Sequence, residues 1–427
     1  VTTDATCSRI YPTDGVGASL IGFFRADHDT SHATGLEFSL DGYLAGREGL
    51  ARRFMTANPR QKLGRVVLED ATHGQSLVLT LDSDLQAICE SRLRARVAAT
   101  GSVGGSVLVL DPKTGDVLAA ASWPLLETRK GNHPDGAVWN NRTFTTQYAP
   151  GTVFKIFTTA ALLRHGAIDT ATVYLSDKVK GDGIYVRNDR NHKYGNLGLM
   201  EAFTKSSNVW FAKAVANLSA EEFYRDLKDF GFGQQTAAPY RAQPAGILNP
   251  PKRWSGRSKQ TIAIGQEVAV TSLQLGLAVC SAANGGELFA PRMIREVRDD
   301  RGQVIEKVRP VSLRRVMTSP LTDLLRKAMG RVVTEGTGVS AGQDWLVVGG
   351  KTGTAQKRCE GDSGYTPGAY IASFAGLAPL DDPRLVVVTV LDQPRGVYHY
   401  AAQSAAPLFR DIIGDVRRST DWLTDAP

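Results

Sequence analysis

Hydrophobic and polar positions follow two different patterns along the chain. Residues 1–72 are rich in Gly, Asp and Arg and sustain neither a helical nor a strand period, which is typical of a small irregular domain. The pattern then becomes regular. Residues 77–81 predict a strand, and Asp82 or Ser83 predicts the N-cap of a helix with one apolar face. We therefore expect two domains, 1–72 and 73–427.

Two pairs of apolar runs predict β-hairpins at opposite ends of the second domain. Residues 106–110 and 117–121 flank a turn that contains Pro and Gly, and residues 370–377 and 385–391 flank a proline-bounded turn. The stretch between them is largely helical, and a helix interrupted at Pro407 closes the chain. This order predicts a mixed α/β fold in which an antiparallel sheet is flanked by helices.

Composition excludes several classes of protein. The apolar and charged fractions, 42% and 22%, are those of an ordinary globular chain. The net charge is +7, but the chain has no long run of like charges, so we expect no nucleic-acid partner. Of four scattered cysteines, Cys89 and Cys280 lie in apolar helical patterns and are expected as buried thiols. No apolar stretch reaches membrane-spanning length, so we expect any membrane anchor to precede Val1.

One polar cluster in the first domain has side chains that could bind a metal. His28 and His32 lie close to Asp27 and Asp29, but neither helical nor strand spacing organises them. We interpret the segment as a solvated loop and predict neither a metal nor a cofactor for the protein.

Candidate chemistry begins with Thr152 and Lys155. The apolar run 152–165 ends at Gly166 and predicts a buried helix, in which a hydroxyl and a lysine three residues apart share one face. A lysine in apolar surroundings loses its proton more easily and can serve as the base for a hydroxyl nucleophile. We expect the Lys155 amine within about 2.6–3.2 Å of the Thr152 hydroxyl.

A second motif is Ser206-Ser207-Asn208. Ser206 and Asn208 lie two residues apart, so both side chains can point the same way from a turn. A serine in this place can relay a proton, and an asparagine can hold a substrate amide. Such a string is common in loops, so its meaning depends on the motifs around it.

The third motif, residues 351–354, follows a short apolar run and predicts a strand of the same sheet. Gly353 permits the close approach of another backbone, and the strand edge offers an N–H group to an acyl oxygen. Lys351, with the hydroxyls of Thr352 and Thr354, forms a receptor for a carboxylate.

Hydroxyl-x-x-Lys, Ser-x-Asn and Lys-Thr-Gly, in this order, form the signature of penicillin-binding proteins and β-lactamases. The chain also resembles the transpeptidase domain of class B, monofunctional penicillin-binding proteins at residues 111–120, 265–286, 370–379 and 405–413. Their N-terminal pedestal is similar to residues 9–12, 21–22 and 35–37. The resemblance implies a penicillin-binding-protein/β-lactamase-like domain over 73–427 and a partial, dimerisation-like pedestal over 1–72. The basic, glycine-containing segment that precedes the Tyr-Pro pair in these proteins is missing.

The resemblance also implies catalytic roles. Thr152 would attack the carbonyl of the penultimate D-Ala, and Lys155 would take its proton. Ser206, helped by Lys351, would relay the proton to the leaving D-Ala. Family members have a serine where this chain has Thr152, and a threonine methyl group restricts χ1 and crowds the carbon under attack.

Binding roles follow from the same resemblance. Asn208 would hold the peptide amide, and Thr352 and Thr354 would bind the terminal carboxylate beside Gly353. The N–H groups of Thr152 and Thr354 would form the oxyanion hole. The implied partners are D-Ala-D-Ala stem peptides, β-lactams and a membrane-embedded wall-synthesis protein, at the extracytoplasmic face of the bacterial inner membrane.

Several functions remain open at this stage. The chain is either a working peptidoglycan D,D-transpeptidase with a threonine nucleophile, or a member that has lost most of its catalysis and acts as a peptide or β-lactam scaffold or sensor, or a member whose serine was replaced by engineering. A β-lactamase shares the three motifs, but no segment can be assigned to the base that its deacylating water needs. The lifetime of the penicillin adduct distinguishes a lactamase from a transpeptidase.

Overall fold

A five-stranded antiparallel sheet forms the centre of the computed structural model, which describes residues 10–11, 15–27, 30–55, 62–125, 140–179, 181–359 and 364–423. Its strand order is β14-β15-β16-β6-β7. The strands are β6 (Gly104–Leu110), β7 (Val117–Trp123), β14 (Gly349–Arg358), β15 (Tyr365–Ala378) and β16 (Leu385–Asp392). The two predicted hairpins meet in the middle of the sheet, where Val388 of β16 pairs with Leu108 of β6. Both ends of the regular part of the chain therefore build one sheet, as predicted.

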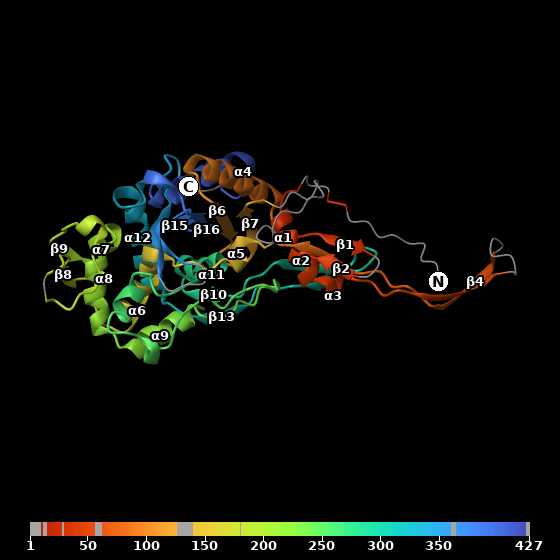
Figure 1. Cartoon of the computed structure of the whole chain (residues 1–427), viewed down its shortest axis with the longest axis horizontal. Helices are drawn as coiled ribbons and strands as arrows, with labels where there is room; N and C mark the ends of the chain where they lie inside the picture. The colour runs from red at the N-terminus through yellow and green to blue at the C-terminus, as the bar shows by residue number, and fades with distance from the viewer. Residues whose placement is uncertain are drawn as a thin grey trace.

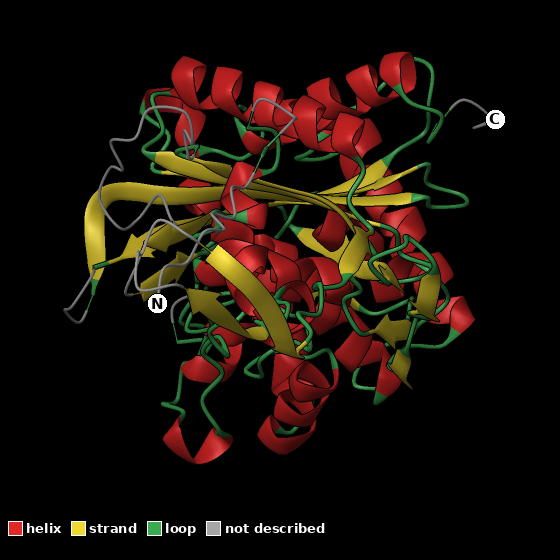
Figure 2. Ribbon diagram, turned by 90° about the vertical axis from the view of Figure 1, so that its right-hand side faces the viewer, coloured by secondary structure: helices red, strands yellow, loops and turns green. Residues whose placement is uncertain are grey.

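Helices cover both faces of this sheet (Figure 2). On one face, α4 (Ser83–Thr100) and α13 (Ala405–Ser419) contact each other and the strands, whereas α11 (Ser272–Ala283) contacts β6 and β16 from the other face. Side chains of β16 alternate accordingly, since Val387 packs in the core beside α4 and α13 and Val388 in the core beside α11. The mixed α/β fold with a flanked antiparallel sheet is confirmed.

The sequence pattern predicted the N-cap of α4 correctly and the interruption of α13 incorrectly. The N-cap predicted for α4 is confirmed at Asp82, whose carboxylate accepts hydrogen bonds from the N–H groups of Asp84 and Leu85 at 3.0 Å each. The interruption predicted at Pro407 is wrong. This proline lies in the first turn of α13, where a backbone N–H group has no partner within the helix anyway.

A largely helical region lies at one end of the sheet, on the left in Figure 1. Its elements are α6 (Lys155–Arg164), β8 (Val173–Leu175), β9 (Asn196–Gly198), α7 (Leu199–Thr204), α8 (Asn208–Ala214), α9 (Ala220–Asp229) and α10 (Ser258–Ala263). The remaining elements of the larger part of the chain are β5 (Ser76–Leu79), α5 (Arg142–Thr145), β10 (Glu287–Phe289), β11 (Ile294–Arg298), β12 (Val304–Lys307), β13 (Ser312–Arg315) and α12 (Ser319–Glu335). Among the described residues, no helix combines the length and the apolar character that crossing a bilayer requires.

The N-terminal elements divide into a packed part and an extended part. They are α1 (Ala18–Ile21), β1 (Phe24–Asp27), β2 (Thr30–Ala33), α2 (Gly35–Ser39), α3 (Asp41–Leu44), β3 (Leu50–Met55) and β4 (Lys62–Glu69). Leu20 of α1 and Leu36 of α2 are buried in the same core as α11. The β3–β4 hairpin instead extends away from the rest of the chain (Figure 1). The sequence pattern did not predict these strands. Apolar side chains such as Val66 and Val67 are exposed at successive positions, so apolar and polar residues do not alternate.

The polar cluster at residues 27–32 is organised differently from the solvated loop that we predicted. Asp27 ends β1, and His32 pairs with Arg25 in the antiparallel β1–β2 hairpin. Strands of four residues are too short to show a reliable alternating pattern, so the prediction missed them. His28 and Asp29 lie outside the described residues. Within the described part of the chain, no group of three or more His, Cys, Asp or Glu side chains could hold a metal ion.

Candidate active site

The segment that carries Thr152 and Lys155 is two helices rather than the single predicted one. A 3₁₀ helix, η3 (Gly151–Phe154), holds Thr152, and α6 begins at Lys155. Side chains at positions i and i+3 of a 3₁₀ turn lie nearly above one another. The local geometry therefore still brings the hydroxyl-bearing and lysine side chains to the same side of the segment.

Close backbone contacts hold η3 in place. The N–H group of Gly151 donates to the carbonyl oxygen of Gly265 at 3.0 Å, and a Cβ atom on Gly265 would lie 1.9 Å from the carbonyl oxygen of Gly151. From the other side, a Cβ atom on Gly353 would lie 2.3 Å from the carbonyl oxygen of Pro150. The close approach that the sequence predicted at Gly353 is thus present, and η3 is packed between two glycines.

The third motif lies where it was predicted, in a strand. Residues 351–354 belong to β14, the edge strand of the central sheet, which has β15 as its only neighbour in that sheet. Thr352 and Thr354 line the cleft described below, on alternate positions of the strand. The Thr352 hydroxyl lies 2.7 Å from that of Thr337, and the Thr354 hydroxyl accepts a hydrogen bond from the N–H group of Ala401.

The second motif connects α7 to α8 through a residue in an unusual conformation. Ser206 has a φ of 59°, in the left-handed region that few non-glycine residues occupy. Ser207 caps α8, since its hydroxyl accepts a hydrogen bond from the N–H group of Trp210 at 3.2 Å. The turn and the cap together direct Ser206 and Asn208 towards the two lysines.

The two lysines meet at Ser206. The Lys155 amine donates to the carbonyl oxygen of Ser206 at 2.6 Å and to Oδ1 of Asn208 at 2.7 Å, and it lies 3.3 Å from the Ser206 hydroxyl. The Lys351 amine donates to the same hydroxyl at 2.9 Å. A neutral Lys155 amine that donates its two hydrogens to these carbonyl groups keeps its lone pair free to accept a proton.

Burial lowers the basicity of both amines. The pKa of Lys155 is held well below its usual value, first by burial and then by the nearby charge of Lys351. Burial also lowers the pKa of Lys351, to about 7. Because Lys155 carries the additional repulsion, we expect it to lose its proton before Lys351 does.

The hydrogen bond that we predicted between Lys155 and Thr152 is not found among the described contacts of either residue. The Thr152 hydroxyl instead donates to the carbonyl oxygen of Thr352 in β14 at 2.8 Å. The prediction assumed that a shared face guarantees a contact, but the side-chain rotamer of Thr152 turns the hydroxyl towards the edge strand. The Thr152 hydroxyl has to give up this bond before it can donate to the Lys155 amine.

These residues border one cleft with a volume of about 810 Å³. Of the residues singled out from the sequence, Thr152, Ser206, Asn208, Thr352 and Thr354 line it. Lys155 and Lys351 are buried and do not line it, but both amines contact the hydroxyl of Ser206, which does. The structure thus brings the three motifs together.

Several lining residues were not predicted. His399 ends η8 (Gly396–His399), and Tyr400 follows it. Residues 187–191 come from the loop that contains η4 (Asp189–Asn191). This loop is rich in polar residues that tolerate a left-handed backbone, and this composition was the sequence signal that could have indicated it. It predicts a structured turn but does not indicate which way the side chains face.

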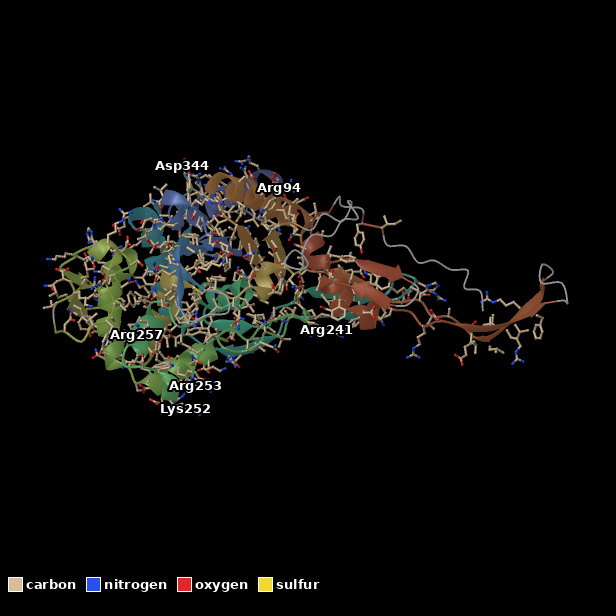
Figure 3. The ribbon with its side chains drawn as sticks, in the orientation of Figure 1. Arg94, Arg241, Lys252, Arg253, Arg257 and Asp344 are labelled. Atoms are coloured by element: carbon tan, nitrogen blue, oxygen red, sulfur yellow. The ribbon has the colours of Figure 1, made fainter. Side chains whose placement is uncertain are left out.

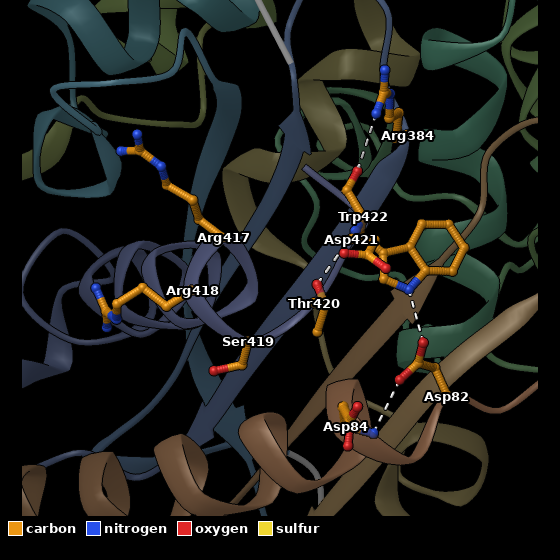
Figure 4. Close-up of a pocket in the computed structure, with 9 residues that line it drawn as sticks. All are labelled: Asp82, Asp84, Arg384, Arg417, Arg418, Ser419, Thr420, Asp421 and Trp422. Carbon is orange, nitrogen blue, oxygen red and sulfur yellow. Dashed lines mark hydrogen bonds between the residues drawn. The ribbon is translucent and has the colours of Figure 1, made fainter. Parts of the chain in front are cut away.

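A second cleft, of about 780 Å³, lies elsewhere, where the C-terminal segment packs beside the start of α4 (Figure 4). Among its lining residues, the Trp422 indole N–H donates a hydrogen bond to Asp82 at 2.9 Å. None of the residues singled out from the three motifs lines it. This cleft therefore marks the attachment of the C-terminal segment and not the candidate chemistry.

Comparison with known proteins agrees with this geometry. The profile of the penicillin binding protein transpeptidase domain matches residues 105–414. Stage V sporulation protein D of Bacillus subtilis is 33% identical over 414 residues, which cover 95% of this chain and 63% of that protein. Penicillin-binding protein PbpB of Mycolicibacterium smegmatis is 32% identical over 422 residues, which cover 95% of this chain and 64% of that protein. The chain thus spans slightly less than two thirds of the length of these relatives.

Solved structures show the same fold. Penicillin binding protein 3 of Mycobacterium tuberculosis, in its apo form, matches with a TM-score of 0.82 and 31% identity, over 96% of this chain and 90% of that one. The same protein has been solved with aztreonam and with ampicillin. The chain belongs to the penicillin-binding protein transpeptidase family. Within it, the chain is homologous to the class B members.

Proposed function

We propose that this chain is a peptidoglycan D,D-transpeptidase that forms its acyl-enzyme on Thr152. Relatives named as probable peptidoglycan D,D-transpeptidases, such as PenA of Neisseria meningitidis at 30% identity, support the reaction class. The observation that carries the proposal is the chain of hydrogen bonds from Lys351 through Ser206 to Lys155 beside the Thr152 turn. It supplies both a base for the nucleophile and a proton for the leaving group.

In the proposed acylation, Thr152 Oγ1 forms a bond to the carbonyl carbon of the penultimate D-Ala, and its proton passes to the neutral Lys155 amine. The N–H groups of Thr152 and Thr354 stabilise the resulting oxyanion. The carbon–nitrogen bond then breaks. The leaving D-Ala nitrogen takes a proton from Ser206, which Lys155 replenishes while the Lys351 cation stabilises the serine oxygen.

In the second half-reaction, the amine of another stem peptide attacks the ester carbon. A new amide bond forms, the ester bond to Thr152 breaks, and the amine proton returns through Lys155 to Thr152. A β-lactam enters by the same first step, but its amide nitrogen stays attached to the acyl group after the ring opens. That tethered nitrogen slows the second step, so a long-lived adduct is expected.

Asn208, Thr352, Gly353 and Thr354 complete the proposed site. Asn208 holds the substrate amide, and the two threonine hydroxyls bind the terminal carboxylate. Gly353 lets η3 approach β14 closely enough for the two oxyanion donors to converge. In this proposal the Thr152 hydroxyl exchanges its bond to the Thr352 carbonyl for one to Lys155 when substrate enters.

The test compares this chain with its Thr152→Ser variant after incubation with benzylpenicillin, by intact mass. We expect a slow adduct on Thr152 and a faster one on the serine variant, by roughly 100-fold, since misplacement by about 1 Å has an effect of that size. The free energy of unfolding should change by no more than about 1 kcal/mol, because one methyl group is removed. Thr152→Val, which lacks the hydroxyl, is the matched control without an adduct.

The presence and lifetime of the penicillin adduct distinguish the candidate functions. An adduct that persists for minutes supports the transpeptidase, whereas turnover of penicillin within seconds indicates a β-lactamase. No adduct on either the threonine or the serine form leaves a non-catalytic scaffold or sensor and refutes the proposal.

Three further features of the proposal concern the whole protein. Residues 1–72 act as a partial pedestal and residues 73–427 as the transpeptidase domain. The reaction takes place at the extracytoplasmic face of the bacterial inner membrane, where the stem peptides are. A membrane-embedded wall-synthesis protein is the proposed partner of the pedestal. Expression of 73–427 alone, followed by the penicillin assay, tests the division, because an independent transpeptidase domain should still form the adduct.

A further inference from the structure

One wall of the active-site cleft carries positive charge that the proposed chemistry does not use. The lining residues include Arg187, Arg190 and Lys205, against a single acidic residue, Asp189. Arg190 and Asp189 lie 3.9 Å apart and neutralise one another in part. Arg187 and Lys205 remain as the excess cations of this wall. Both side chains are exposed.

Both excess cations belong to residues whose backbone adjoins the Ser-x-Asn motif. Lys205 immediately precedes Ser206, and its amine lies 6.0 Å from the ring centre of Tyr194. The carbonyl oxygen of Arg187 accepts a hydrogen bond from Nδ2 of Asn208 at 2.8 Å. Neither side chain forms an ion pair within the described part of the chain. Their charges are therefore held at the cleft without an internal counter-charge.

The loop that presents this wall is strained and braced from the opposite side of the cleft. Arg190 and Asn191 have φ values of 49° and 54°, which are uncommon for non-glycine residues. The Arg190 guanidinium lies 5.1 Å from the ring centre of Tyr400 and donates to its hydroxyl at 3.1 Å. The Tyr400 hydroxyl in turn donates to Asp189 at 3.2 Å. Backbone strain of this kind persists where the surroundings enforce it, and it clusters at binding sites.

Basic residues elsewhere on the described surface, such as Arg94, Arg241, Lys252 and Arg253, do not line this cleft. Figure 3 labels Arg94 and Arg241 at separate places on the surface, whereas Lys252 and Arg253 lie next to each other. Arg241, for example, lies over the ring of Phe38 and joins the body of the chain to α2. At the cleft, by contrast, two cations that form no ion pair in the described part of the chain lie beside the Ser-x-Asn motif.

We propose that Arg187 and Lys205 form a subsite for a carboxylate on the side chain of the substrate residue that precedes D-Ala-D-Ala. This inference rests on the proposed function, which sets the direction of the peptide: its C-terminal carboxylate lies at Thr352 and Thr354, and its preceding amide lies at Asn208. The residue before that amide then reaches the wall that Arg187 and Lys205 define. The site selects acidic donor peptides over neutral ones.

Equilibrium binding of two matched peptides tests the subsite without requiring catalysis. N-acetyl-L-Glu-D-Ala-D-Ala and N-acetyl-L-Gln-D-Ala-D-Ala have nearly the same shape and differ by one charge. We expect calorimetry at low salt to show about fivefold tighter binding of the acidic peptide, the size that partly exposed charge contacts give. The preference should decrease with added salt.

Variants separate the subsite from general attraction. Arg187→Gln and the double variant with Lys205→Gln should reduce the preference stepwise towards none, while binding of the neutral peptide stays the same. Lys193→Gln removes an exposed cation of the same loop that does not line the cleft, and it should leave the preference intact. Equal binding of the two peptides by the parent chain, an undiminished preference in the double variant, or no binding of either peptide at millimolar concentration overturns the proposal. Benzylpenicillin, whose side chain is uncharged, reports on the proposed function separately through its adduct.

Discussion

At the scale of single residues, the site depends on how two buried amines share one proton. Lys155 and Lys351 both contact the Ser206 hydroxyl, so one amine can be neutral while the other stabilises a developing negative charge on the serine oxygen. The three motifs do border one cleft, but the hydrogen bond that spacing predicted between Lys155 and Thr152 is not among the described contacts. Sequence spacing also did not predict that Ser206, and not Thr152, would lie between the two lysines, because that depends on the left-handed backbone at Ser206 and on the rotamer of Thr152.

This arrangement predicts a bell-shaped pH dependence of acylation. The rate should rise with pH as Lys155, whose pKa is held well below its usual value, becomes neutral and able to accept the Thr152 proton. It should fall as Lys351 loses its charge, near a pKa of about 7. Benzylpenicillin acylation from pH 5 to 9, corrected for spontaneous hydrolysis, measures both limbs.

A matched variant identifies the group behind the alkaline limb. Lys351→Arg keeps the positive charge at all these pH values, so the fall above neutral pH should disappear. A parent rate that continues to rise up to pH 9 would contradict a role for the Lys351 cation.

At the scale of elements, the position of Thr152, the proposed nucleophile, is decided by packing between segments that are distant in sequence. The turn η3 touches Gly265 of the segment before α11 on one side and β14 on the other. The sequence indicated Gly353 as a point of close approach, since it belongs to a motif. Gly265 gave no comparable signal, because its function is visible only once Gly151 lies against it.

We predict that Gly265→Ala reduces acylation by roughly 100-fold or more, measured in the faster Thr152→Ser background. The new methyl group would lie 1.9 Å from the carbonyl oxygen of Gly151 and must displace η3, and a shift of about 1 Å costs about that factor in rate. Gly302→Ala is the control, because Gly302 has the same φ of 78° but open space around it. Equal acylation rates in the two alanine variants would show that the close contact does not position the nucleophile.

At the scale of the whole molecule, buried contacts attach the N-terminal elements to the transpeptidase part. The N–H group of Gly17 donates to Glu90 of α4 at 3.0 Å, and the side chain of Gln86 donates to the same oxygen at 2.8 Å. The change in sequence pattern predicted a boundary near residue 72. It could not predict this attachment, because a buried glutamate on a helix has no distinctive spacing.

The buried Glu90 at this attachment lowers the free energy of unfolding in a pH-dependent way. Burial raises the pKa of Glu90, so its charged form is disfavoured in the folded chain, and this penalty grows as pH rises through the raised folded-state pKa. Glu90→Gln keeps an oxygen acceptor and removes the charge. We expect a higher Tm than the parent at pH 7 and little difference near pH 4, where both folded and unfolded forms carry a protonated carboxyl. The exposed Glu306→Gln should not change Tm at either pH, and a Glu90→Gln gain of equal size at both would refute the argument.

The strand order of the central sheet also has a consequence for how the protein is made. The partners at its centre are hundreds of positions apart, since Val388 of β16 pairs with Leu108 of β6. During synthesis, the β6–β7 hairpin is made long before β16, the strand that pairs with β6. Pairings between such distant segments form slowly. A ribosome-bound nascent chain that stops before β16 should therefore remain unreactive towards fluorescent penicillin although all three motifs have already been translated.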